Sequence, residues 1–524
     1  MSAPPPLALN GHTLTLDQVV EVARGGRELV LDEQARARMA TSRAWVARAC
    51  KGSRPVYGIN TGFGSLARVR IPPEHSATLS MNLIRSHAAG VGPELPADVV
   101  RAMMLLRANA LAKGVSGCRP RLVEVVLQML NADVVPVVPS QGSCGSSGDL
   151  APLSHLGLVL TEGDHGEARL AGERMSAESA MAGAGIERME LEAKEGLAIT
   201  NGAQLTTALT ALAVFDAQRL VLIAEIAAAM SVEALLGASR AFAAPVHRLR
   251  PYAGAIATAA NLRRLLDGSS LVDSVPGKVQ DAYSLRCTPQ VLGAVRDTIT
   301  HVSSQVSVEL NAATDNPVIL VDEPGEDKAY SAGLFHGEPV GIAADILKIA
   351  VSELASLSER RLYRLTTGSL SARLPPALAH RDRPELGLAL PQTTAAALVS
   401  ENKSLCWPSS VDSIPTCEDQ EDHVAMSTTA ARGAVRIVEN ARRVVAIELL
   451  GAASALAFRR EESPEARLGI GTHAALEQVE NVLATLDQGA TPSEQIAALV
   501  DLTRGEVLTS VVPGLNRVGE RGSP

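Results

Sequence analysis

Residues 141–155 contain three consecutive residues, Ser146, Ser147 and Gly148, that can form an electrophile from the backbone itself. The amide nitrogen of Gly148 can attack the carbonyl carbon of Ser146 and close a ring. Loss of one water from the backbone and one from the Ser147 side chain would leave a conjugated methylidene group. The third position must be glycine because the backbone bends tightly there. The first side chain stays outside the reacting atoms, so serine is acceptable at position 146.

Taken alone, the tripeptide also fits a Gly/Ser loop in front of a helix, because Asp149 followed by Leu-Ala-Pro-Leu is a sensible helix start. The surrounding frame adds specificity: Gly-Ser-Cys-Gly-Ser-Ser-Gly-Asp-Leu-Ala-Pro-Leu-Ser-His over 142–155. It resembles the signature of the ammonia-lyases and aminomutases that carry 4-methylideneimidazole-5-one (MIO). Family members usually have Ala where this chain has Ser146. The resemblance implies that MIO forms autocatalytically from residues 146–148, with no external cofactor.

Eliminating ammonia from an amino acid also requires a base near Cβ, and Tyr57 is the candidate. A tyrosine acts as a base only if its pKa, normally about 10, is lowered. By itself Tyr57 also fits a side chain packed at a loop edge. The segment Tyr57–Gly64 resembles the family's lid loop, whose tyrosine takes the β-proton, and this implies the same role for Tyr57.

The reaction further requires a clamp for the substrate carboxylate, and Arg286 is the candidate. A guanidinium matches a carboxylate with two parallel hydrogen bonds, although a helix-end arginine paired with a surface acid has the same sequence appearance. The segment Lys278–Arg286 resembles the second active-site loop of the family. That resemblance implies that Gln280, Tyr283 and Arg286 line the pocket.

Three further positions gain a role from the resemblance, and each also has an ordinary structural interpretation. Asn201 would lie near the MIO carbonyl, or it would cap the following helix. Asn316, in Thr-Asp-Asn-Pro, would lie near the substrate carboxylate, or it would belong to an ordinary turn. Phe335, in Phe-His-Gly, would form the aromatic wall of the site, or it would pack in the core.

The residues that would select the substrate favour two different amino acids. His87 and Glu421 resemble positions of the histidine ammonia-lyases, although both side chains can also hydrogen-bond a phenol. Ala389 stands where those enzymes usually have a pocket methionine, and the missing atoms would make room for a six-membered ring. We therefore predict a tyrosine 2,3-aminomutase of secondary metabolism, which converts L-tyrosine to β-tyrosine through 4-coumarate with some lyase activity. The alternatives are a histidine ammonia-lyase, which makes urocanate and ammonia, and an inactive binding protein on the same fold.

The bulk properties exclude several other classes of function. The 524 residues carry a net charge of −9, spread along the chain, so no nucleic-acid surface is expected. The longest apolar segment, near 205–237, contains charged residues, so no membrane span is expected. The six cysteines show no metal-ligand spacing, so we expect no metal site and free thiols in a reducing cytoplasm. The N-terminus resembles no signal peptide.

The elements that must position these residues are mainly helices. Abundant Ala and Leu with only 2% aromatic residues suit closely packed helices. Helical patterns fall at about 15–25, 32–51 and 96–113, and a small hairpin is expected within 160–175. Longer patterns, joined by polar connections at 238–288, 314–338 and 369–420, predict a bundle; they cover 203–237, 289–313, 339–368 and 421–458.

We predict a mainly α protein with an N-terminal domain at 1–202, which bears the lid loop and MIO. A central helical bundle at 203–458 and a C-terminal helical segment and tail at 459–524 would follow. The resemblance implies the fumarase/aspartase-like fold. It also implies a homotetramer whose active sites draw on three chains and bind a small amino acid substrate.

Overall fold

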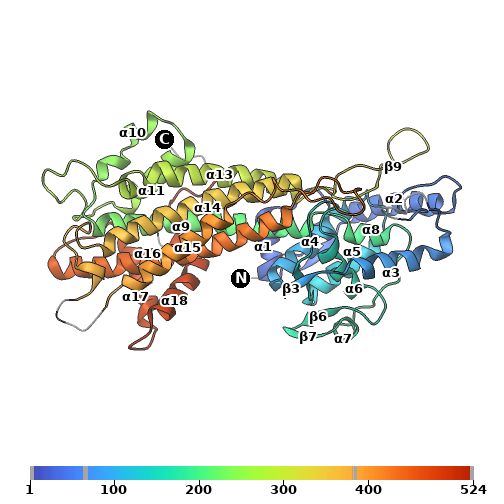
Figure 1. The fold of residues 1–524 in the computed structure, drawn as a ribbon, viewed down its shortest axis with the longest axis horizontal. Helices are drawn as coiled ribbons and strands as arrows, with labels where there is room; N and C mark the ends of the chain where they lie inside the picture. Colours follow the sequence, from blue (N-terminus) through green and yellow to red (C-terminus); the bar gives the residue numbers. More distant parts are fainter. Residues whose placement is uncertain (1–4, 63–68, 381, 383–385, 511, 520–524) are drawn as a thin grey trace. The chain divides into compact units, whose positions relative to one another are not determined.

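The structure is a computed structural model and describes residues 5–62, 69–380, 382, 386–510 and 512–519 (Figure 1). Helices account for 58% of it and strands for 7%, which confirms the predicted mainly α class. The chain forms two compact units. The first comprises Met1–Leu212, Ser303–Asp345 and Pro408–Arg432, and the second comprises Ala213–Val302, Ile346–Trp407 and Gly433–Pro524.

The core of the first unit is built around α4 (Ala97–Ala112), whose residues from Val99 onward are nearly all buried. Helices α1 (Leu16–Gly25) and α5 (Pro120–Asn131) pack against it. Thr15 starts α1 with a reciprocal capping box, which satisfies backbone donors that the first turn would otherwise leave unpaired. The helices predicted at 15–25 and 96–113 are therefore present.

A second group of helices in this unit places the chain segments that carry chemistry. Helix α6 (Leu150–Leu160) packs against α3 (Ser76–His87) and α8 (Glu195–Thr200). The Ser-Ser-Gly segment directly precedes α6, and Asn201 directly follows α8. Packing of α6 on α8 therefore brings two segments that are distant in sequence to one place. Among its described residues, the unit also contains the helical elements α2 (Glu33–Lys51), η2 (Pro73–His75) and α7 (Ala177–Gly183).

In the part of the first unit that the structure describes, the strands are short and form four small sheets. Three sheets have two strands each: β1 (Leu7–Leu9) pairs with β2 (Leu29–Leu31), β3 (Val91–Glu94) with β5 (Pro139–Gln141), and β8 (Val318–Ile319) with β9 (Ala329–Tyr330). In the three-stranded sheet, β6 (Glu167–Leu170) lies between β4 (Val134–Pro136) and β7 (Glu173–Ser176). Strands β6 and β7 are antiparallel, which confirms the hairpin expected near this position.

Long helices form the framework of the second unit, and their bounds match the long helical patterns of the sequence (Figure 1). They are α9 (Gln204–Ala234), α13 (Thr288–Glu309), α14 (Glu338–Thr366) and α16 (Ser427–Glu462), each of which begins or ends in the first unit. Shorter elements of the unit include η3 (Ser239–Phe242), α10 (Ala244–Arg248), α11 (Ala253–Leu265), α12 (Tyr283–Arg286), η4 (Pro376–Leu378), α17 (Ile470–Ala484), α18 (Pro492–Arg504) and α19 (Val507–Ser510).

Buried ion pairs connect these long helices inside the second unit. Arg361 of α14 donates to both carboxylate oxygens of Glu448 on α16, and both side chains are completely buried. Ser231 of α9 and Ser358 of α14 donate to the same carboxylate. Because these hydrogen bonds satisfy the buried charge, the pair fixes how the three helices align. A second pair, Arg296 with Glu225, connects α13 to α9 in the same way.

Two expectations about the connections are wrong. Segment 238–288 was expected to be a polar connection, but it contains the 13-residue helix α11 and the shorter helices α10 and α12. Segment 369–420 was expected to be a polar connection, but it contains the helix α15 (Ala389–Leu405). Only Pro391, Ala395, Val399 and Asn402 of this helix are buried, so its apolar stripe is one residue wide. A stripe that narrow gives little helical periodicity in the sequence. Within the part of the chain that the structure describes, no helix has the length and apolarity needed to cross a membrane.

Candidate active site

The Ser146-Ser147-Gly148 segment lies between β5 and α6, and its backbone requires glycine at the third position. Gly148 has φ +76°, and a Cβ there would lie 2.4 Å from the carbonyl carbon of Gly202. The backbone nitrogen of Asp149 donates to the carbonyl oxygen of Gly202 at 2.8 Å. The residues after the tripeptide are therefore tied closely to the segment that follows α8.

Asn201 contacts the tripeptide directly. Its Nδ2 donates to the carbonyl oxygen of Ser147 at 2.7 Å. Asn201 follows the last residue of α8, and α9 begins at Gln204, so the amide acts on the tripeptide rather than as an N-cap. Its Oδ1 is buried and has no hydrogen-bond partner among the described residues. A donor at this distance polarises the Ser147 carbonyl.

Asp149 has a role that the sequence did not indicate. Helix α6 does begin at Leu150, but the Asp149 side chain makes no capping hydrogen bond. Its buried carboxylate instead accepts from the Thr206 backbone nitrogen at 2.8 Å and from the hydroxyls of Ser143 and Thr428, each at 2.7 Å. Burial raises the pKa of Asp149 against the opposing effect of these hydrogen bonds. The carboxylate thus anchors the reactive loop to two helix starts.

Glu421 lies against the tripeptide, although it is separated from it by more than half the chain. Its Oε2 accepts a hydrogen bond from Ser146 Oγ at 2.8 Å and another from Thr416 Oγ1. Its Oε1 accepts from Ser147 Oγ. Burial acts to raise the pKa of Glu421, but the bonds from Ser147, Thr416 and Ser146 outweigh it and lower the pKa. The side chain is therefore a carboxylate at neutral pH.

A tight turn presents Glu421 to the tripeptide. Thr416 and Glu421 form a two-way backbone bridge, and Cys417, Glu418 and Asp419 between them all have φ between +52° and +61°. Residues other than glycine and asparagine seldom adopt this left-handed region, and strain of this kind gathers at functional sites. The sequence carries no glycine that would have marked the turn.

The Phe335-His336-Gly337 segment meets the same loop. The backbone nitrogen of Gly337 donates to the carbonyl oxygen of Gly145 at 2.9 Å. His336 Nε2 lies 3.2 Å from the carbonyl oxygen of His423, and the two imidazole rings are parallel with centroids 5.8 Å apart. Phe335 is half-buried beside this contact. Three motifs that are far apart in sequence therefore converge in the first unit.

Asn316 is held next to a buried ion pair. Lys194 Nζ lies 2.9 Å from both carboxylate oxygens of Asp315, and both side chains are fully buried. Asp315 also accepts from the Asn316 backbone nitrogen at 2.7 Å. The Oδ1 of Asn316 accepts from the Ala332 backbone nitrogen at 2.8 Å, which orients the amide.

Arg107 links two of these motifs and was missed from the sequence. This buried residue of α4 donates from Nη1 to the carbonyl oxygens of Asn201 at 2.8 Å and Thr314 at 3.1 Å, and to Gln204 Oε1 at 2.9 Å. Burial lowers its pKa. The available signal was a lone arginine within an apolar helical run, which indicates a buried and partnered charge.

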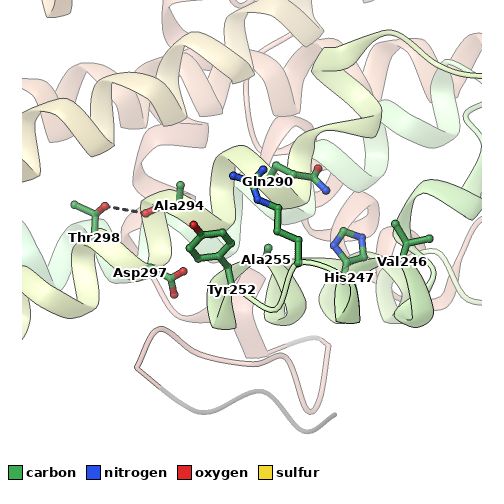
Figure 2. A pocket seen from close by; sticks show the side chains of 9 residues that line it. Val246, His247, Tyr252, Ala255, Gln290, Ala294, Asp297 and Thr298 are labelled. Atoms are coloured by element: carbon green, nitrogen blue, oxygen red, sulfur yellow. Dashed lines mark hydrogen bonds between the residues drawn. The ribbon is translucent and has the colours of Figure 1, made fainter.

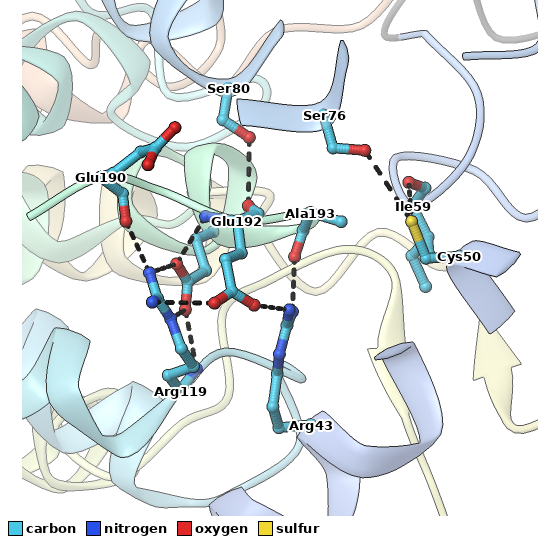
Figure 3. Close-up of polar contacts among 10 residues, drawn as sticks. Arg43, Cys50, Ile59, Ser76, Ser80, Arg119, Glu190, Glu192 and Ala193 are labelled. Carbon is cyan, nitrogen blue, oxygen red and sulfur yellow. Dashed lines mark hydrogen bonds and ion pairs between the residues drawn. The ribbon is translucent and has the colours of Figure 1, made fainter. Parts of the chain in front are cut away.

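Polar contacts also fix the chain segment that leads into α8 and Asn201. Arg119 donates to the Glu195 carboxylate, with a distance of 2.6 Å from Nη2 to Oε2. Figure 3 shows that Arg119 also reaches the carbonyl oxygen of Glu190. Arg43 donates to the carbonyl oxygen of Ala193 at 2.8 Å, and Ser80 donates to that of Glu192 at 3.2 Å. Helices α2 and α3 and the residue that precedes α5 therefore jointly hold this segment in place.

Tyr57 and His87 also belong to the first unit. Tyr57 is half-buried in a turn that Asn60 fixes, because Asn60 accepts from the Val56 backbone and donates to the carbonyl oxygen of Arg54. Phe63 and Gly64 of the same motif lie outside the described residues. The role of Tyr57 as a base stays a prediction.

The imidazole of His87 has a defined tautomer. Its Nδ1 lies 2.8 Å from the carbonyl oxygen of Leu83, which can only accept, so Nδ1 carries the proton. The Ser86 hydroxyl donates to the same carbonyl oxygen and lies 2.9 Å from Nδ1. In the neutral ring, Nε2 is therefore a hydrogen-bond acceptor.

The other four predicted residues lie in the second unit. Gln280 is exposed, and so is the Tyr283 side chain at 71%. Arg286 lies over the Tyr283 ring with its Cζ 4.7 Å from the centroid, and its buried Nε has no hydrogen-bond partner in the described chain. Ala389 is the first residue of α15 and is exposed.

A cavity of about 370 Å³ lies elsewhere in the second unit, between α10, α11 and α13 (Figure 2). Tyr252 and His247 border it together with Asp297, as Figure 2 shows, and none of the predicted site residues lines it. Within the described ranges, no group of His, Cys, Asp and Glu side chains is arranged to hold a metal ion.

Comparison with known proteins identifies close relatives. The model of the family described as aromatic amino acid lyase matches residues 14–481. The chain is 50% identical to the histidine ammonia-lyase of Caldanaerobacter subterraneus subsp. tengcongensis, over 87% of this chain and 88% of the relative. The solved structure of histidine ammonia-lyase from Trypanosoma cruzi gives a TM-score of 0.88 at 38% identity, with 99% of each chain covered. Tyrosine aminomutase from Streptomyces globisporus gives 0.89 at 35%, covering 97% of this chain and 98% of that one.

These relatives establish the fumarase/aspartase-like helical fold and overturn one prediction. The tyrosine 2,3-aminomutase expected from the sequence is wrong, because curated relatives at 46–50% identity over most of the chain are histidine ammonia-lyases. The prediction depended on the room left by Ala389. A single small side chain does not fix the size of a pocket, since the other walls also determine it.

Proposed function

The chain belongs to the aromatic amino acid lyase family and is an enzyme, and we propose that it is a histidine ammonia-lyase. It would convert L-histidine into urocanate and ammonia. The identity of 46–50% to histidine ammonia-lyases over most of the chain supports this substrate. The observation that carries the proposal is the Glu421 carboxylate, which hydrogen-bonds both serines of the electrophile precursor.

The hydrogen-bonding character of the site suits an imidazole. Glu421 is held as a carboxylate, which only accepts, and the tautomer of His87 makes its Nε2 an acceptor as well. A protonated imidazole donates from both ring nitrogens, and a neighbouring carboxylate favours that form. The phenol of tyrosine has a single O–H to donate and its oxygen would need a donor. With His87 at the substrate, as the resemblance implies, two acceptors would therefore favour histidine.

We propose MIO, formed from Ser146, Ser147 and Gly148, as the prosthetic group. Three features of the segment fit it: Gly148 has no room for a Cβ, Asn201 donates to the carbonyl that the ring would retain, and the Ser147 hydroxyl is available for elimination. When present, the group supplies an electrophile for the substrate amine. Autocatalytic formation would require no external cofactor.

The remaining roles follow from the resemblance and the geometry. Tyr57 would take the proton from Cβ of the substrate, and Arg286 would bind its carboxylate, as a guanidinium does in a bidentate pair. The Asn316 amide, oriented by Ala332, would donate to the same carboxylate. Phe335 would pack against the substrate, and Gln280 and Tyr283 would complete the pocket, with Ala389 at its border.

Assembly into a homotetramer would complete the site. Gln280 and Tyr283 are exposed in the single chain, and an exposed Tyr283 over Arg286 suits a residue that a neighbouring subunit covers. The cysteines are all free, which fits a reducing cytoplasm as the location of the enzyme.

A product assay tests the proposal. The purified protein is incubated separately with L-histidine and with L-tyrosine, and the products are separated and identified. We expect urocanate and ammonia from histidine, with at most traces of coumarate or β-tyrosine from tyrosine. Conversion of tyrosine without urocanate would refute the substrate assignment.

The prosthetic group has its own test, in the intact mass and the near-ultraviolet absorbance of the protein. We expect a mass lower than that of the encoded chain by two waters. Ser147→Ala should lack both the absorbance and the activity while it remains folded. A wild-type protein whose mass equals that of the encoded chain, and which has no activity, would favour an inactive binding protein on this fold.

A further inference from the structure

Ser146 is the position at which the reactive tripeptide departs from its usual Ala, and the structure gives the extra hydroxyl a partner. The Ser146 side chain is 7% exposed, and its Oγ donates to Glu421 Oε2 at 2.8 Å. A buried hydroxyl bound to a carboxylate is a charge-assisted hydrogen bond, which is stronger than one between neutral groups. The substitution therefore adds a contact to the residue that the proposed function assigns to the imidazole.

The two oxygens of the Glu421 carboxylate have different partners. Ser146 and Thr416 donate to Oε2, whereas Ser147 donates to Oε1. Formation of the prosthetic group removes the Ser147 hydroxyl as water, and this step would take away the Ser147 donor to Oε1. The donors to Oε2 contain no atom that is eliminated.

We propose that Ser146 is a positioning residue, which together with Thr416 holds Oε2 of the Glu421 carboxylate in place. The other oxygen, Oε1, loses its Ser147 donor when the Ser147 hydroxyl is eliminated. It then accepts the N–H of the substrate imidazole. The inference rests on the proposed histidine ammonia-lyase function. Maturation of the tripeptide then creates the electrophile and exposes the acceptor for the substrate in the same event. With Ala at position 146, the Thr416 hydroxyl and the Cys417 thiol, whose hydrogen bond also lowers the pKa of Glu421, would be the side-chain donors left on the carboxylate.

The kinetic test is a double-mutant cycle between Ser146→Ala and Glu421→Ala, measured with L-histidine. Alanine is the usual residue at position 146, so Ser146→Ala should still form the prosthetic group with its full near-ultraviolet absorbance. We expect its KM to rise about tenfold, with a smaller fall in kcat, because one hydrogen bond to a charged group is lost. In the Glu421→Ala background the same change should alter kcat/KM by less than about twofold.

Two further variants separate positioning from a general effect on packing. Ser146→Thr keeps a hydroxyl and should retain a KM within about threefold of the wild type. Ser154→Ala removes another fully buried serine hydroxyl of the same unit, which donates to the Leu150 carbonyl oxygen and does not contact Glu421. It should leave the KM for histidine unchanged.

A crystal structure of the matured protein provides a readout that does not depend on turnover. We expect Glu421 Oε2 within hydrogen-bond distance of Ser146 Oγ, and in Ser146→Ala a Glu421 side chain with more than one conformation. The inference would be overturned if Ser146→Ala changed kcat/KM equally in the wild-type and Glu421→Ala backgrounds. It would also be overturned by a matured structure in which Glu421 does not contact Ser146. Failure of the wild type to make urocanate would instead refute the proposed function, while the crystal structure would still decide the contact.

Discussion

Asn201 Nδ2 donates a hydrogen bond to the carbonyl oxygen of Ser147 at 2.7 Å. The contact joins the residue after α8 to the centre of the reactive tripeptide. Arg107 supports it from the other side, because its guanidinium holds the Asn201 carbonyl oxygen at 2.8 Å. The donor is therefore fixed in advance, which is the property that makes a hydrogen bond effective on a carbonyl where charge develops.

Removing this donor should slow the reaction. We expect Asn201→Ala to lower kcat for histidine by about 10²-fold or more, since loss of one fixed donor to such an oxygen has that effect in other enzymes. The assay is the rate of urocanate formation at saturating histidine. Near-ultraviolet absorbance should be recorded alongside, so that the rate refers only to matured protein. A kcat within threefold of the wild type would contradict the role of Asn201.

Gly148 should not tolerate a side chain. In Gly148→Ala the new Cβ would meet the Gly202 backbone at 2.4 Å, and the residue would keep a φ of +76°, so both a clash and backbone strain arise. We expect loss of the near-ultraviolet absorbance and a lower Tm.

Gly172→Ala is the matched control for this change. Its φ is +85°, but nothing lies within 4 Å of the added Cβ. It should therefore lose only about 1 kcal/mol of stability and keep full activity. Similar behaviour of the two variants would show that space at Gly148 does not limit the reaction.

Breaking the buried pair of Lys194 and Asp315 should destabilise the first unit. Lys194→Met leaves an uncompensated buried carboxylate, and such changes cost about 3–5 kcal/mol. The double variant Lys194→Met/Asp315→Asn leaves neither charge and should lose clearly less. Chemical denaturation of the three proteins measures both losses. Equal losses in the single and double variants would mean that the charge itself is unimportant.

Acid should destabilise the protein through His155. Burial lowers the pKa of His155 below its usual 6.5, and its Nε2 accepts from the Gly90 backbone at 3.3 Å. The unfolded chain therefore binds a proton at a higher pH than the folded protein does. The contribution of neutral His155 to the free energy of unfolding is fully present above about pH 6.5, the pKa in the unfolded chain. It is lost as the pH falls toward the lower pKa of the folded protein.

His155→Gln tests this pH dependence, because glutamine can still accept from Gly90 and does not titrate. We expect its free energy of unfolding to fall less than that of the wild type as the pH is lowered from 7. His165→Gln, which changes an exposed imidazole, serves as the control. Identical pH profiles for His155→Gln and the wild type would contradict the prediction.

Local patterns in the sequence were sufficient to predict the mainly helical class and the long helices. The long pattern of Ala, Leu and Val at 203–237 matches α9, which is buried on nearly all sides. Periodicity placed the helix at 15–25, close to α1, because α1 buries one face. It failed for α15, whose buried stripe is too narrow to produce a clear period. The tripeptide at 146–148 was also visible from sequence, since its chemistry depends on three adjacent residues.

What each motif contacts was decided only by the tertiary structure. Glu421 reaches Ser146 across 275 residues, and no local pattern records such a contact. Asp149 looked like a helix cap, but its carboxylate turns instead to Thr206 and Thr428, because burial with several donors stabilises it more than one exposed cap would. The sequence by itself determined the helices and the reactive segment, because both depend on neighbouring residues. The surroundings of that segment depend on long-range packing, which only the folded chain provides.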